Sequence, residues 1–145
     1  MTTPPAPGPP EPAGRYDRLV ILRAVALGNL LAIPGALANS AWSGEEGKDG
    51  LVGISFVLVV LGFVVAGISA GAAARTEPAR HGALAGLVAF VPVELIAILG
   101  RLDREAPIRP VGIVLLALFA ACAGTAGAQI GARRRASRTP SEERP

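Results

Sequence analysis

The acidic residue Glu94 lies inside a long apolar stretch and is the residue of this chain with the most evident chemical potential. An ionised carboxylate inside a membrane is costly unless it is paired, hydrogen-bonded or protonated. Two interpretations are open: Glu94 is a protonatable site for the movement of ions or solutes, or it is a polar contact that fixes the register of two helices. The candidate partners at a similar depth are Asn39, Ser40, Ser55 and Arg101.

The other residue types that perform catalysis or bind metals are scarce. The chain has a single histidine, His81, and a single cysteine, Cys122, which cannot form a Cys/His metal cluster. The sequence also has no recognisable nucleophile–base pair and no phosphate-binding loop. It therefore predicts no catalytic residue, no cofactor, no metal site and no enzymatic activity.

Four apolar stretches carry these residues and fill most of the 145-residue chain. They cover residues 24–42, 51–74, 82–100 and 111–132, and each is long enough to cross a hydrocarbon core of roughly 30 Å. Hydrophobic residues make up 51% of the chain and the mean hydropathy is +0.49, which is typical of a membrane protein. We expect an all-α integral membrane bundle over residues 19–132, with four transmembrane helices at about 19–42, 51–74, 82–100 and 109–132.

The uneven distribution of basic residues predicts the orientation of the helices. Ten of the 14 lysines and arginines lie in the N-terminal flank, the second loop and the C-terminal tail, which four crossings place on one side. Basic flanks favour the cytoplasmic side, and the excess of arginine over lysine is typical of a GC-rich bacterial genome. We expect a multi-pass protein of the bacterial plasma membrane with both termini in the cytoplasm. The ten residues are Arg15, Arg18, Arg23, Arg75, Arg80, Arg133, Arg134, Arg135, Arg138 and Arg144.

The first apolar stretch has a second interpretation. Arg15, Arg18 and Arg23 could form the basic region of a signal peptide, with the Ala-Leu-Ala sequence at residues 36–38 as its cleavage site. Cleavage would leave three helices and an N-terminus outside the cell. The apolar run is longer than that of most signal peptides and a proline-rich arm precedes it, which favours an uncleaved helix.

The two halves of the chain resemble each other. Residues 28–34 match residues 86–92 at an offset of 58, because both begin with Gly and end with Pro. Residues 66–72 match residues 126–132 at an offset of 60 through shared Ala and Gly positions. These matches predict two similar hairpins related by a pseudo-twofold axis along the membrane normal. The alternative is chance similarity within a composition dominated by Ala, Gly, Val and Leu.

Glycines spaced four residues apart predict close contacts between helices. Each such pair places two flat patches on one helix face, where a second backbone can approach. Packing inside the chain is the favoured interpretation, and dimerisation is the alternative. The glycines are Gly67 and Gly71, Gly82 and Gly86, and Gly127 and Gly131.

The segment from Gly67 through Arg75 to Gly86 resembles a family of small four-helix bacterial membrane proteins of uncharacterised function. That family combines a glycine-rich end of the second helix, a basic cytoplasmic turn and a glycine-rich start of the third helix. The resemblance implies the four-helix fold and brings no catalytic residues. Glu94 is not part of the matching motif.

The two ends of the chain are expected to be disordered, as a proline-rich cytoplasmic arm over residues 1–18 and a basic cytoplasmic tail over residues 133–145. The tail arginines are positioned to contact anionic lipid headgroups of the bilayer. The isoelectric point of about 10 therefore reflects membrane topology, and we expect no binding of nucleic acid.

The function that the sequence favours is that of a structural or accessory membrane protein. Its glycine-rich helix faces would pack against other membrane proteins or against a second copy. The alternative is a small transporter or channel that uses Glu94 as a protonatable intramembrane site. In size and in its single membrane carboxylate the chain resembles the four-helix multidrug exporters, but those carry the glutamate in the first helix.

Overall fold

A computed structural model of the chain describes residues 18–137, which form four long helices and no strand. Each helix is long and apolar enough to cross a membrane. The predicted all-α fold with four membrane-spanning helices is therefore confirmed. The proline-rich arm and most of the basic tail lie outside the described residues. The helices are α1 (Arg18–Trp42), α2 (Asp49–Ala73), α3 (Pro78–Asp103) and α4 (Pro110–Ala136).

Two helices are longer than the apolar pattern predicts. Helix α3 begins at Pro78 instead of residue 82, because proline is well suited to the first turn of a helix, where no partner exists for its missing N–H. Helix α4 continues to Ala136, so the prediction of disorder from residue 133 is wrong for its first four residues. Arginine and alanine are good helix formers, and cations near a helix C-terminus interact favourably with its dipole.

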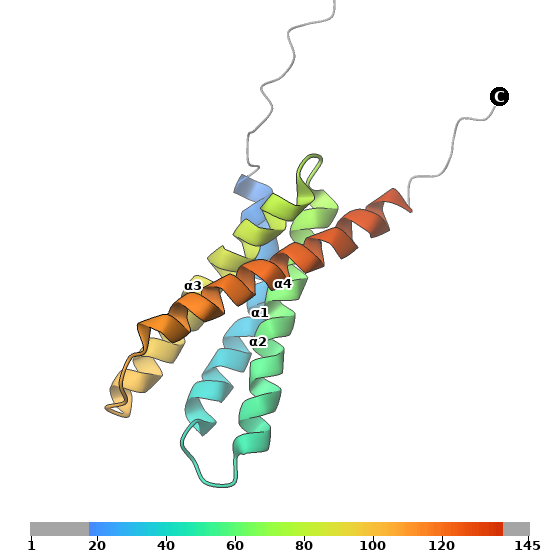
Figure 1. Ribbon diagram of the computed structural model, residues 1–145. Coiled ribbons are helices and arrows are strands. Elements are labelled where there is room, and N and C mark those ends of the chain that lie inside the picture. Colours follow the sequence, from blue (N-terminus) through green and yellow to red (C-terminus); the bar gives the residue numbers. More distant parts are fainter. Residues whose placement is uncertain (1–17, 138–145) are drawn as a thin grey trace, which may run out of the picture.

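The helices form two antiparallel hairpins whose connecting loops lie at the same end of the bundle (Figure 1). The α2–α3 turn lies at the opposite end, together with the start of α1 and the end of α4. Helices α2 and α3 each contact all three other helices, whereas α1 and α4 do not touch each other within the described residues. The cross-section of the bundle is therefore a rhombus with α2 and α3 on its short diagonal.

Small residues fill the interior of the bundle and large apolar residues cover its exterior. The buried hydrophobic residues are mostly alanines, and Phe63 is the largest fully buried side chain. Leu30 and Val111 are 71% and 72% exposed, as are many other leucines and valines along the four helices to a lesser degree. This distribution fits a bundle whose outer surface faces lipid and whose helices associate through close backbone contact.

Glycines bring α2 and α4 together through a symmetric contact. A Cβ atom added to Gly67 would collide with the backbone of Gly124, and one added to Gly127 would collide with the carbonyl of Val64. Gly127 and Gly124 each stand 60 residues after Gly67 and Val64. One turn further along, Gly71 meets Ala128 and Gly131 meets Ile68 with the same offset. The contact between the two hairpins therefore follows the offset of 60 found in the sequence.

The contacts inside the two hairpins follow a different register. A Cβ atom on Gly28 of α1 would lie 2.5 Å from the Gly62 carbonyl and 2.7 Å from the Ala66 Cβ of α2. Gly86 of α3 instead meets Ala120 and Gly124 of α4, which lie 58 residues after Gly62 and Ala66. The α3–α4 pair is thus displaced by two residues relative to the register that the α2–α4 contact would require. Because Gly28 and Gly86 are also 58 residues apart, the contact inside the second hairpin repeats the contact inside the first at a single offset of 58.

These contacts divide the bundle into two halves. We call the half that contains the α2–α3 turn the glycine half, because it holds all six glycines that the four-residue spacing singled out, and all six are buried. We call the half that contains the α1–α2 and α3–α4 loops the polar half, because it holds Asn39, Ser55, Glu94 and Arg101. In Figure 1 the two hairpins diverge in the polar half.

Candidate functional site

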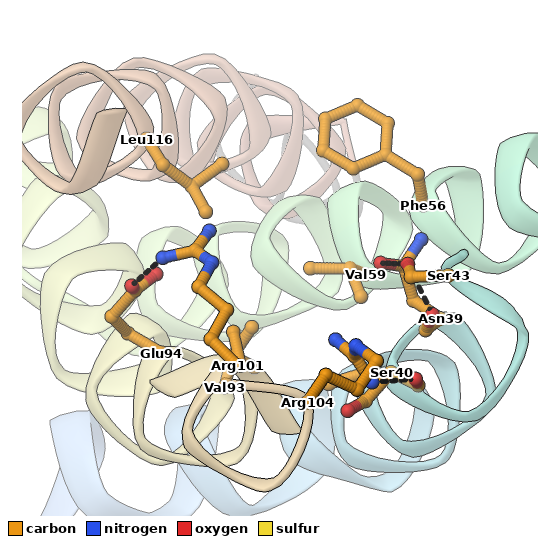
Figure 2. A pocket seen from close by; sticks show the side chains of 12 residues that line it. Asn39, Ser40, Ser43, Phe56, Val59, Val93, Glu94, Arg101, Arg104 and Leu116 are labelled. Atoms are coloured by element: carbon orange, nitrogen blue, oxygen red, sulfur yellow. Dashed lines mark hydrogen bonds and ion pairs between the residues drawn. The ribbon is translucent and has the colours of Figure 1, made fainter. Parts of the chain in front are cut away.

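A cavity of about 280 Å³ lies in the polar half, where the two hairpins separate. All four helices contribute to its wall, and the charged residues come from helix α3 and from Arg104, which directly follows it (Figure 2). The volume is close to the lower limit of ordinary ligand pockets, so it suits a small solute or a cluster of water molecules. Its lining comprises Ala36, Asn39, Ser40, Ser43, Phe56, Val59, Val93, Glu94, Ala97, Arg101, Arg104 and Leu116.

Glu94 is buried in the wall of this cavity, with only 5% of its surface exposed. It stands about 5 Å beyond the middle of α3, towards the α3–α4 loop, at a rise of about 1.5 Å per residue. One carboxylate oxygen, Oε1, lies 3.4 Å from Nη1 of Arg101. The other oxygen, Oε2, is buried and has no hydrogen-bond partner among the described residues. The Glu94 side chain therefore lines an open volume, and its second carboxylate oxygen is an unsatisfied acceptor that is covered from solvent.

The helix itself brings Arg101 to Glu94. The two residues are seven positions apart in α3, which is close to two full turns, so their side chains lie on one face. Figure 2 shows the Arg101 side chain turned back towards Glu94 along the cavity. A distance of 3.4 Å is long for a charge-assisted hydrogen bond. The pair is therefore close enough to offset the two charges while leaving much of the hydrogen-bonding capacity of both groups unused.

The structure pairs Glu94 with one of its four candidate partners only. Asn39 and Ser55 bond to each other instead: the Asn39 amide donates to the Ser55 hydroxyl at 3.1 Å and to the Val52 carbonyl at 3.0 Å. Ser40 contributes its backbone carbonyl to Arg104. The Asn39 amide on α1 reaches these two groups on α2 because close packing at Gly35 already holds the two helices together. The expected contact between Glu94 and these α1 and α2 side chains is absent.

Arg104 closes one side of the cavity, and the sequence analysis did not single it out. Its Nη1 atom donates to the Ser40 carbonyl at 2.6 Å, which links α3 to α1. A wider groove of about 710 Å³ lies between the ends of α1 and α3, and Ser40, Ser43 and Arg104 line both hollows. Arg104 therefore stands between the cavity and the groove. Its position three residues after Arg101 was the available signal, because that spacing places both on one helix face.

Sequence reasoning also missed the close packing of α1. Gly28 and Gly35 also lie close to the backbone of α2, where an added Cβ atom would stand 2.5 Å from the Gly62 carbonyl and 2.9 Å from the Ser55 carbonyl. Ala32 lies between them and contacts Gly62. The spacing of four and then three residues places Gly28, Ala32 and Gly35 on one face of α1. Alanine takes the place of a glycine in this series. A search for small residues of any type at this spacing would have found it.

The chemistry available in the cavity is that of binding and proton exchange. It offers a carboxylate oxygen without a partner, two guanidinium groups, an amide and two hydroxyl-bearing residues, next to an apolar wall. The cavity lining contains no cysteine or histidine, and within residues 18–137 no group of His, Cys, Asp and Glu residues could hold a metal ion. Such a set of groups suits a small polar ligand or a proton.

No protein-family model matches the chain, and neither a curated protein nor a solved structure does. The geometry of the cavity therefore carries the functional argument. The fold and the cavity together define a multi-pass membrane protein with a partly closed polar site in one half of its bundle.

Proposed function

We propose that this chain is a small transporter or channel of the bacterial plasma membrane, with Glu94 as its protonatable intramembrane site. The observation that carries the proposal is the Oε2 atom of Glu94, which is buried without a partner in the wall of a cavity of about 280 Å³. A carboxylate that served only to fix helix register would have both oxygens engaged, because an unsatisfied buried acceptor is costly. The proposal assigns no enzymatic activity.

The accessory role that the sequence favoured finds less support in the contacts. All six glycines of the four-residue spacing pack against helices of the same chain. A second protein could not use these faces without first separating the bundle. The exposed surface that remains consists largely of leucine, valine and isoleucine, which lipid covers as well as a partner does.

The orientation belongs to the same proposal. The α2–α3 turn, with Arg75 and Arg80, lies at the same end as the described start of α1 and the end of α4. The positive-inside rule supports a cytoplasmic location for this end, so the cavity would face the outside. Arg133 and Arg134 are exposed at the end of α4, where they could contact anionic headgroups of the inner leaflet.

The proton is the probe that tests the proposal, since it requires no knowledge of the solute. Vesicles reconstituted with the full chain and loaded with a pH-sensitive dye receive a pH step in the presence of valinomycin. We expect the wild-type protein to dissipate the gradient faster than protein-free vesicles. Glu94→Gln should return the rate to that of empty vesicles, because an amide cannot exchange a proton in this range.

The matched control is Glu105→Gln, which removes an exposed acidic residue from the loop at the same end of the bundle. This variant should keep the wild-type rate. The proposal is wrong if wild-type vesicles are no faster than empty ones, or if Glu94→Gln and the wild type dissipate the gradient equally fast. The orientation is tested separately by reporter fusions, which should report cytoplasm after Ala74 and the outside within residues 45–49.

A further inference from the structure

The hydrogen-bond acceptor of the cavity and its hydrogen-bond donors lie at different sides of the cavity. Glu94 supplies the free acceptor oxygen at one side. Arg104 lies at another side beside Ser40, and Arg101 stands between them in Figure 2. Each guanidinium carries five N–H donors, whereas the bonds observed for Arg101 and Arg104 each use one Nη1 atom within the described residues. The cavity therefore presents one negative and two positive groups to a single small volume.

Neither a simple cation nor a simple anion satisfies this arrangement. A cation that bonded to the carboxylate of Glu94 would face two arginines in the same cavity, and like charges repel. An anion that bonded to the arginines would leave Oε2 without a donor. A ligand with a hydrogen-bond-donating ammonium group and an anionic group satisfies both ends at once.

The rest of the wall is apolar and fits a short hydrocarbon linker. Phe56 and Val59 of α2, Val93 of α3 and Leu116 of α4 line the cavity between the polar groups. A compact ligand with methylene groups between its two charges would bury them here, whereas a fully hydrated inorganic ion would gain nothing from this surface.

We propose that the cavity binds a small zwitterion, in which a primary ammonium group donates to the carboxylate of Glu94 and a phosphate or carboxylate accepts from Arg101 and Arg104. This inference names the ligand class of the site in the proposed function and rests on that function. The same chemistry has two sources. One is a phosphatidylethanolamine headgroup that enters sideways where the hairpins diverge, and the other is a free zwitterion that enters from the loop end.

The ammonium group provides the sharpest test, since a quaternary ammonium has the same charge but no N–H to donate. The full-length protein in detergent is titrated with phosphoethanolamine and phosphocholine, and the corresponding two phospholipids are compared by native mass spectrometry. We expect the ethanolamine compound to bind about tenfold more tightly than the choline compound, the size of one charge-assisted hydrogen bond. Preference among the lipids alone identifies the headgroup source, and preference among the free compounds identifies a soluble ligand.

Two variants locate the two ends of the ligand. Glu94→Gln should abolish the preference for ethanolamine over choline, and Glu105→Gln should keep it. Arg104→Gln should weaken the binding of both compounds by about tenfold while the preference remains, and Arg109→Gln, an exposed arginine outside the cavity lining, should change neither. The comparison of the ethanolamine and choline compounds uses the wild type alone, so it remains decisive if a variant fails to fold.

The inference is overturned if the wild type binds neither compound in free or lipid form, if it binds both equally, or if Glu94→Gln keeps the preference. These outcomes leave the proton measurement untouched, because that assay contains no zwitterion. Conversely, the protein could prefer the ethanolamine compound through Glu94 and yet dissipate no pH gradient. The ligand site would then stand, and the proposed transport function would be wrong.

Discussion

The glycine half and the polar half are built from the same four helices but differ in how those helices meet. In the glycine half, Gly67, Gly71 and Gly124 allow backbones to touch, so that an added Cβ atom would overlap the neighbouring helix. In the polar half, α1 and α2 still meet closely at Gly35, but the two hairpins stand apart and the cavity beside Glu94 remains open. Backbone contact between the two hairpins closes one end of the bundle, while the hairpins leave room between them at the other end.

This difference follows from where the small residues lie along each helix. In α4, Gly124, Gly127 and Gly131 are buried, whereas Gly112, near the loop end, is exposed and has an added Cβ atom no closer than 4.0 Å to another group. Without a second tight contact, α4 diverges from α2 towards the loops (Figure 1). The four helices can therefore leave a polar cavity in one half, because close backbone packing in the other half holds them together.

The largest expected effect comes from filling one of the close backbone contacts. Gly124 meets α3 at Gly82 and Gly86 and also receives Gly67 of α2. Gly124→Leu should destabilise the bundle by about 3 kcal/mol or more, because its added side chain would overlap the α3 backbone at Gly82 and Gly86 and push α3 away. The free energy of unfolding in a dodecyl sulfate titration, followed by circular dichroism, measures the loss.

Gly112→Leu provides the matched control, since it adds the same side chain to the same helix in the polar half. We expect a change within about 0.5 kcal/mol, because the residue is exposed and has open space around it. Equal losses in the two variants would refute the contrast between a closely packed half and an open half.

Hydropathy and charge predicted the four helices, but not the directions in which they diverge. Composition and length are sufficient for the spans, since a run of about 20 apolar residues has few alternatives. The offset of 60 between Gly67 and Gly127 also reappears at the α2–α4 contact. The two-residue displacement of α4 against α3 depends on which small residue, Ala120 or Cys122, faces Gly86, and a list of small residues does not reveal that choice.

The candidate site was predictable in part. Glu94 stood out because it is an acidic residue in an apolar stretch, and Arg101 could be named from its spacing along the same helix. The cavity could not be foreseen, because it arises from the angle between hairpins rather than from any local pattern. The same holds for the link between Arg104 and the Ser40 carbonyl, which joins residues 64 positions apart.

A second, smaller effect concerns the buried carboxylate of the polar half. Glu94→Leu should destabilise the protein by about 1–3 kcal/mol, because it leaves Arg101 without its partner in a partly buried position. Glu94→Gln should lose less, since an amide oxygen still accepts a hydrogen bond from Arg101. The same unfolding titration measures both. A leucine variant as stable as the wild type would mean that the ion pair contributes nothing to the fold.

The hydrogen bonds of Asn39 in the polar half should contribute less to stability than the ion pair between Glu94 and Arg101. Asn39→Leu removes the two hydrogen bonds that link α1 to Ser55 and to the Val52 carbonyl of α2. Hydrogen bonds between membrane helices contribute about 0.6 kcal/mol each on average, so we expect a loss of about 1 kcal/mol. A double-mutant cycle with Ser55→Ala isolates the share of the side-chain pair. A coupling energy indistinguishable from zero would show that the Asn39–Ser55 pair contributes nothing to the contact between these helices.

The smallest effect is expected where the glycine half meets water. Glu77 and Arg80 form an ion pair with a distance of 3.0 Å, and their side chains are 49% and 66% exposed. Exposed pairs contribute about 0–1 kcal/mol and are screened by salt, so Glu77→Gln should cost less than about 1 kcal/mol at low salt and less again at high salt. The loss in Glu94→Leu should depend much less on salt, because Glu94 is buried. Unfolding titrations of both variants at two salt concentrations make the comparison, and a strong salt dependence for Glu94 would mean that its cavity is as well solvated as the α2–α3 turn.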